Sequence, residues 1–134
     1  MARQFRKHYQ VEEARALLPL VKRWLAQLSA VREKLQRHEC WAEPRLDSGD
    51  DLGGPRVHAW VRDLSRFREA AQEFQAREIL LKDIDRGLVD FPALRNGVEV
   101  LLCWEKTEED IRFWHPLCEG YAGRRPIDDD FPLG

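Results

Sequence analysis

Residues 82–126 read KDIDRGLVDFPALRNGVEVLLCWEKTEEDIRFWHPLCEGYAGRRP, and the Asn96-Gly97 pair near the middle of this stretch determines the fold. Asn-Gly between two apolar runs is the strongest short signal for a β-hairpin, because a type I′ turn needs positive φ at both central positions. This turn sets the register, so that Phe91 lies opposite Leu102 and Asp90 lies opposite Cys103.

The register sorts the hairpin residues into two faces, because side chains alternate along a strand. One face is entirely apolar and is the predicted core: Val89, Phe91, Ala93, Val100, Leu102 and Trp104. The opposite face carries Asp90, Pro92, Leu101, Cys103 and Glu105. A slip of one residue would bury two carboxylates in the core, which supports the register.

The turn before this hairpin has two readings, and the pattern does not choose between them. A two-residue turn at 86–87 places Asp83 opposite Asp90, whereas a three-residue turn at 85–87 places Lys82 there. Two facing carboxylates repel, which raises one pKa or recruits a cation. A facing lysine and aspartate form an ordinary cross-strand salt bridge.

Two amphipathic helices precede the strands. Apolar residues recur every three or four positions over residues 11–39 and again over residues 55–77, which is typical of helices. The segment 40–54 is rich in Gly, Asp and Pro and predicts a loop. The sequence therefore predicts an α+β fold, in which an antiparallel helical hairpin packs on a three-stranded antiparallel β-meander of strands at about 79–85, 88–94 and 98–105.

The first helix has two further features. Pro19 cannot donate a helical hydrogen bond, so we expect either a kink or a true helix start near Leu18. A second apolar row, formed by Leu17, Trp24 and Val31, lies beside the main apolar stripe. This surplus is wider than one partner helix covers, so we predict a homodimer formed through the first helix.

After the meander, Thr107 followed by acidic residues predicts a short C-terminal helix of about two turns that ends before Pro116. Glu108 and His115 are seven residues apart and would share one face of this helix.

The sequence predicts a loop and then a tail at the end of the chain. The loop 120–126 carries Arg124 and Arg125, two guanidinium groups that could bind a small anionic ligand. Residues 127–134 predict a loose acidic tail. With 134 residues, the chain has the size of a single domain.

Composition narrows the function classes. The chain is 34% charged and 43% hydrophobic with a net charge of -2, which is typical of a folded protein. The overall pI near 6.1 argues against nucleic-acid binding. Three cysteines without Cys-x-x-Cys spacing argue against a disulfide framework or a zinc ribbon. The sequence shows neither a signal peptide nor an apolar run of membrane-spanning length, so we expect a cytoplasmic protein with no membrane partner.

Several motifs together resemble the bacterial and archaeal domain-of-unknown-function 2203 family. They are VEEA at 11–14, LLP at 17–19, KDIDRGLVDFPA at 82–93, LCW at 102–104, Glu108, WH at 114–115 and GYAGRRP at 120–126. The resemblance covers nearly the whole chain and implies no established activity. The chain departs from the family pattern at Gln10, where Thr or Ser is usual, at residues 105–107, which replace an Arg-x-Gly run, and at Pro116.

Two functional hypotheses follow, from different classes. The first is a homo-oligomeric interaction or scaffold module, in which Asp90 pairs with Lys82 or Arg124, and His115 caps the short helix. The sequence favours this hypothesis.

The second hypothesis is a site for a metal or an anionic ligand. Its candidate metal ligands are Asp90, Glu108 and His115, with Asp83 and Cys103 as extra ligands, and Arg124 would clamp an anion. Carboxylates and a histidine suit divalent iron, manganese or zinc, and such an ion could support hydrolysis or redox chemistry. A third and weaker hypothesis, nucleophilic catalysis by Cys103, would require a lowered thiol pKa, which a neighbouring aspartate opposes.

Overall fold

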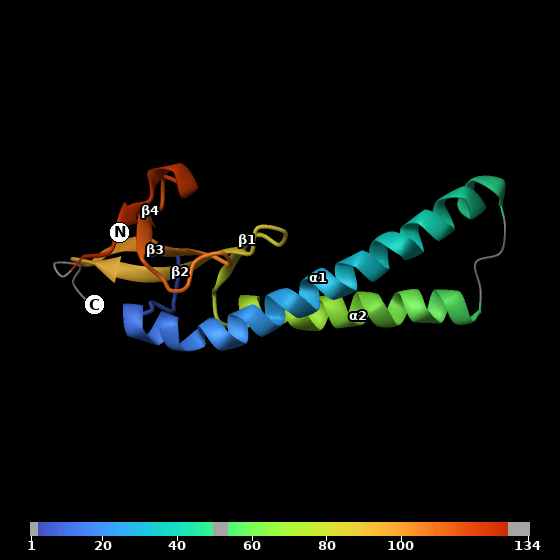
Figure 1. The fold of residues 1–134 in the computed structure, drawn as a ribbon, viewed down its shortest axis with the longest axis horizontal. Helices are drawn as coiled ribbons and strands as arrows, with labels where there is room; N and C mark the ends of the chain where they lie inside the picture. Colours follow the sequence, from blue (N-terminus) through green and yellow to red (C-terminus); the bar gives the residue numbers. More distant parts are fainter. Residues whose placement is uncertain (1–2, 50–53, 129–134) are drawn as a thin grey trace.

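The computed structural model describes residues 3–49 and 54–128 and contains two helices and an antiparallel five-stranded sheet (Figure 1). The helices are α1 (Val11–Ser48) and α2 (Pro55–Ala76). The strands are β1 (Leu80–Asp83), β2 (Leu88–Arg95), β3 (Val98–Glu105), β4 (Phe113–Pro116) and β5 (Arg125–Pro126), and a 3-10 helix, η1 (Tyr121–Gly123), precedes β5. The strands follow chain order in the sheet, so the α+β class is confirmed and the predicted meander gains two strands. Parts of the predicted loop 40–54 and tail 127–134 lie outside the described residues.

The central hairpin has the predicted register at every position. Phe91 pairs with Leu102 and Asp90 with Cys103. Asn96 and Gly97 adopt φ of 53° and 78°, as a type I′ turn requires. Each residue of the predicted core face is at most 4% exposed. These residues are Val89, Phe91, Ala93, Val100, Leu102 and Trp104.

The turn before the hairpin follows neither predicted register. Leu80 lies opposite Asp90, and an irregularity between Leu81 and Asp83 shifts the pairing so that Asp83 faces Leu88. Each regular register would have placed a charged residue on the core face. The bulge avoids this, because Leu81 packs against the core while Lys82 is exposed.

Helix α1 is longer than predicted and continues through two prolines. It starts at Val11, so a start near Leu18 is wrong, and it continues through Pro44 to Ser48, so the predicted loop is wrong over residues 40–48. The apolar period fades there, but Ala42 is still buried. The helix ends because Gly49 adopts φ of 77° and donates its N–H to the carbonyls of the last turn.

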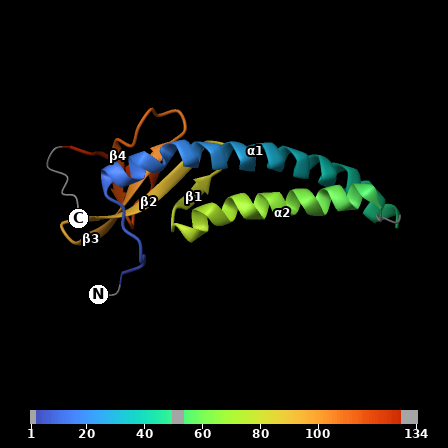
Figure 2. The same cartoon turned by 90° about the horizontal axis from the view of Figure 1, so that it is seen from below.

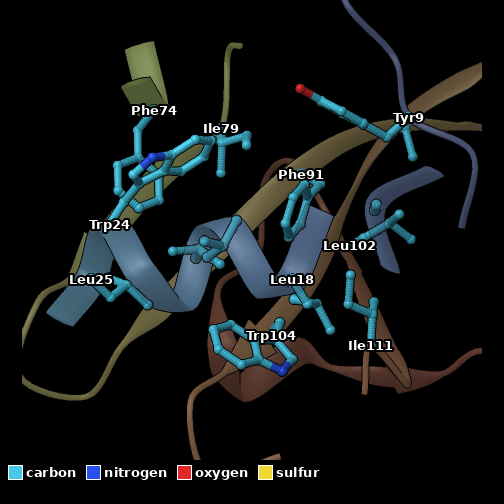
Figure 3. Close-up of a cluster of buried hydrophobic side chains, with 14 of the residues drawn as sticks. Tyr9, Leu18, Trp24, Leu25, Phe74, Ile79, Phe91, Leu102, Trp104 and Ile111 are labelled. Carbon is cyan, nitrogen blue, oxygen red and sulfur yellow. The ribbon is translucent and has the colours of Figure 1, made fainter. Parts of the chain in front are cut away.

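One face of the sheet packs against the helices to form the core (Figure 3). Phe91 and Trp104 from the sheet meet Leu18 and Leu25 from α1 in this cluster. Trp24 of α1 belongs to it as well, and its ring makes an edge contact with Phe74 of α2, with centroids 5.6 Å apart. Trp24 is only 7% exposed, so the subunit itself already covers the centre of the predicted second apolar row.

The far part of the helical hairpin extends beyond the sheet (Figures 1 and 2). We call residues 31–46 and 55–68 the arm. Asp63 of α2 is buried in the arm and accepts a hydrogen bond from His38 of α1, with 2.9 Å between Nε2 and Oδ2. This pair lies between the two helices. Leu64 is one of the apolar residues that recur over the predicted second helix, and it is 46% exposed instead of buried.

The predicted short C-terminal helix is absent, because residues 107–115 form a turn and then enter β4. The Glu108 carbonyl accepts a hydrogen bond from the Trp104 indole, and its carboxylate accepts one from the Glu105 N–H. These bonds hold the segment in a turn. Strand β4 then places Trp114 opposite Leu102 on the core face and His115 opposite Leu101 on the other face.

Candidate metal centre

Three predicted metal ligands meet on the face of the sheet opposite the helices. Asp90, Cys103 and His115 come from β2, β3 and β4, and one ligand atom of each lies within 4.8 Å of the other two. Their exposed fractions are only 1–2%. The hairpin register places Asp90 directly opposite Cys103, and the β3–β4 register places His115 opposite Leu101, on the same face.

The backbone fixes the orientation of the His115 ring. Its Nδ1 lies 2.9 Å from the Pro116 carbonyl oxygen, which can only accept a hydrogen bond, so Nδ1 carries the proton. In the neutral ring, Nε2 therefore presents a lone pair, and this atom lies 3.1 Å from Oδ2 of Asp90. A lone pair facing a carboxylate oxygen is unfavourable unless a proton or a cation lies between them.

Asp90 is poorly satisfied by the protein. Within the described residues, its Oδ1 is buried without a hydrogen-bond partner, and its Oδ2 lies 3.1 Å from Nε2 of His115. A buried acceptor without a partner costs about 1–3 kcal/mol, and more when it is charged. Such groups in a native fold call for an explanation, and a cation is one.

Cys103 is a protonated thiol in this environment. Burial raises its pKa to about 12, and the negative charge of Asp90 adds to the effect. A thiol with this pKa is a poor nucleophile at neutral pH, so the hypothesis of nucleophilic catalysis loses its chemical basis. A bound metal ion would instead favour the thiolate form of Cys103, because a thiol that coordinates a metal ion loses its proton.

The remaining predicted ligands lie in other interactions. Glu108 accepts two hydrogen bonds from Nη2 of Arg124, at 2.6 and 2.8 Å. Asp83 accepts the backbone N–H of Arg86 and pairs with Leu88, and it is not a member of the three-residue cluster.

The two arginines of the predicted anion clamp differ in their surroundings. Arg124 donates hydrogen bonds to Glu108. Its guanidinium carbon lies 4.1 Å from the ring centroid of Phe113 and 4.6 Å from that of Tyr121. Arg125 is exposed and pairs with Glu119 at 3.2 Å. The aromatic partners of Arg124 were not recognised in the sequence. The alternation in Phe113-Trp114-His115 is the signal that could have identified β4 and placed Phe113 beside Cys103.

These features define an α+β protein with a buried Asp-Cys-His cluster on three adjacent strands, on the face away from a helical hairpin. The chain belongs to the family described as "Uncharacterized conserved protein (DUF2203)", whose model matches residues 7–127. The resemblance found in the sequence is thus confirmed. Neither the curated proteins nor the solved structures contain a significant match. Across residues 3–49 and 54–128, neither helix is long and apolar enough to cross a membrane.

Proposed function

We propose that this protein binds one divalent transition-metal ion through Asp90, Cys103 and His115. The observation that carries the proposal is the arrangement of unpaired acceptors: the His115 Nε2 lone pair faces a buried carboxylate whose other oxygen has no partner. An imidazolium would satisfy only one of these oxygens. A cation among the three side chains would satisfy both the carboxylate and the imidazole.

The donor set favours zinc among the candidate ions. It combines a thiolate, an imidazole nitrogen and a carboxylate oxygen, which are the ligands that zinc takes in proteins. A thiolate is a poor ligand for manganese, and divalent iron is the next candidate after zinc. The Pro116 carbonyl supplies the second-shell hydrogen bond that metal-bound histidines usually make, which orients Nε2 toward the ion.

Three protein ligands leave one position of a tetrahedral ion to water or to a small ligand. The ion would join the three central strands of the sheet, so its binding free energy would add to the stability of the fold. Metal binding is the function we assign, and no particular reaction is attached to it.

The test is the metal content of the full chain after purification without chelator and after titration with zinc, iron and manganese. We expect about one zinc per chain, and loss of most of this zinc in Asp90→Asn, Cys103→Ser and His115→Gln. The matched control is Asp83→Asn, because this carboxylate lies outside the cluster. An unchanged zinc content in a folded Asp90→Asn variant would refute the proposal.

A second candidate function, an interaction module that forms a homodimer through α1, is favoured by a groove between the two helices. The groove has a volume of about 510 Å³, and Trp24, Val31 and Ala70 are among its lining residues. Its other lining residues include both signs of charge, namely Arg23, Arg66, Glu69 and Glu73. A two-fold axis can bring opposite charges of such a surface together, which suits a second copy of the chain as the partner.

Light scattering at micromolar concentration tests the homodimer. Ala30 is exposed and lines the groove, so Ala30→Glu should convert a dimer to a monomer. The matched control is Ala26→Glu, an exposed alanine of the same helix that lines a different pocket. A monomeric mass for the parent protein would contradict this second candidate.

A further inference from the structure

We propose that residues 118–124, here called the lid, close over the metal centre and that their opening controls access to it. This inference rests on the proposed function, because the lid would govern how fast a metal ion enters and leaves. It also concerns the apo protein, where the lid would govern exposure of the Cys103 thiol.

The position of the lid follows from Arg124. Its Nη2 lies 3.4 Å from the carbonyl oxygen of Cys103, and its guanidinium lies over the ring of Phe113, which pairs with Cys103 across β3 and β4. The segment after β4 lies on the side of the sheet away from α1 (Figure 1). Arg124 therefore lies beside the clustered ligands, on the face where no helix covers them.

The backbone of the lid is tied mainly to itself. Its backbone hydrogen bonds are local: the N–H groups of Glu119, Gly123 and Arg124 donate to the carbonyls of Pro116, Gly120 and Tyr121. None of the three residues of η1 is buried. A segment with few buried contacts and only local hydrogen bonds opens at low free energy without unfolding the sheet.

Side chains fasten the lid to the sheet at two points. The first is the pair of short hydrogen bonds from Arg124 to Glu108, whose side chains are only 11% and 18% exposed. The second is Tyr121, whose hydroxyl donates to Glu105 at 3.1 Å and whose ring lies under the Arg86 guanidinium. The partly buried ion pair is the stronger of the two fastenings, because its charges are less screened than those of an exposed pair.

The rate of thiol modification measures lid opening directly and does not require a metal. The protein is the full chain with Cys40→Ser and Cys118→Ser, which removes the two exposed cysteines and leaves Cys103. After chelator treatment, it is reacted with dithionitrobenzoate. Closed protein should react slowly, because Cys103 is 1% exposed.

The test variant is Glu108→Gln, which keeps an acceptor oxygen for the Glu105 N–H but removes the charge that holds Arg124. We expect the labelling rate of Cys103 to rise about 10- to 100-fold. The matched control is Glu119→Gln, which removes the exposed partner of Arg125 in the same segment and should change the rate less than about fivefold.

Three results would refute the proposal that residues 118–124 act as a lid. The first is equal labelling rates for Glu108→Gln and Glu119→Gln. The second is a labelling rate in Glu108→Gln that rises steeply in low urea, because exposure would then come from global unfolding. The third is zinc transfer from loaded protein to a chelator that is no faster in Glu108→Gln than in the parent. If the parent binds no zinc, the proposed function fails, but the thiol measurement still decides whether the lid opens.

Discussion

Asp63→Asn is expected to loosen the arm while leaving the sheet intact. Asp63 is 3% exposed and accepts a hydrogen bond from His38 at 2.9 Å between the two helices. The His38 ring stacks on Trp60, and its Nδ1 is buried without a partner. The pair is therefore a buried polar link between the two helices of the arm.

The size of the effect follows from the type of bond. A hydrogen bond to a charged group contributes about 1.5–3 kcal/mol, and asparagine keeps one acceptor oxygen, so we expect the lower end, about 1.5 kcal/mol. Local opening of the arm should then become about tenfold more frequent.

Hydrogen exchange measured by mass spectrometry resolves this local effect. We expect about tenfold faster exchange in peptides from the arm and unchanged exchange in peptides from β2 and β3. The matched control is Glu73→Gln on the same helix, which removes only an exposed pair with Arg77 and should cost about 0–1 kcal/mol. If Asp63→Asn exchanges no faster in the arm than Glu73→Gln does, the reasoning is wrong.

The same pair makes a pH prediction. The hydrogen bond from His38 holds the pKa of Asp63 below its usual range, despite burial, which acts in the opposite direction. Because the folded-state pKa lies below the unfolded value of about 3.9, the stabilisation is present above that pH and is lost as the pH falls through the folded-state pKa. The difference in arm stability between parent and Asp63→Asn should therefore shrink below about pH 4.

Three further predictions concern the sheet and its attachments. Phe91→Ala should lower the free energy of unfolding by about 3–5 kcal/mol in urea denaturation, because the ring is fully buried; a loss below about 1 kcal/mol would contradict the core assignment. Gly87→Ala should cost about 1–2 kcal/mol or more by the same assay, because φ is +62° and a Cβ would lie 2.6 Å from the Cβ of Lys106; an unchanged stability would argue against this turn. Glu99→Gln should increase proteolysis near the N-terminus, because the carboxylate accepts hydrogen bonds from His8 and from two backbone N–H groups, and unchanged cleavage would refute that anchoring role.

The central hairpin was predictable because one local signal fixes everything that follows from it. The Asn96-Gly97 turn determines the pairing of Asp90 with Cys103, and therefore two members of the candidate metal centre. The third member, His115, was predicted from the wrong element. The sequence placed His115 on a short helix, because Thr107 and its acidic neighbours are typical of a helix N-terminus. In the structure, His115 lies near Asp90 because β4 pairs with β3.

The failures share a physical cause, namely hydrogen bonds, ion pairs and a bulge that regular sequence patterns do not reveal. Glu108 accepts hydrogen bonds from Trp104 and Glu105 and thereby stabilises a turn where local preference favoured a helix. Glu108 also pairs with Arg124 and is therefore not one of the clustered ligands. The spacing of these two residues in the sequence does not predict their pairing. In α2, Asp63 is buried against His38, whereas the neighbouring Leu64 is 46% exposed. The β-bulge near Lys82 similarly resolves a conflict that regular strand patterns could not.

The most direct test of the metal centre is X-ray absorption at the zinc edge on the full chain loaded with one equivalent of zinc. The proposed site predicts one sulfur at about 2.3 Å together with nitrogen and oxygen ligands at about 2.0–2.2 Å. In Cys103→Ser, the sulfur signal should disappear, whereas in Cys118→Ser, the exposed control, it should remain. A zinc shell of nitrogen and oxygen alone in the parent protein would contradict the assignment of Asp90, Cys103 and His115 as its ligands.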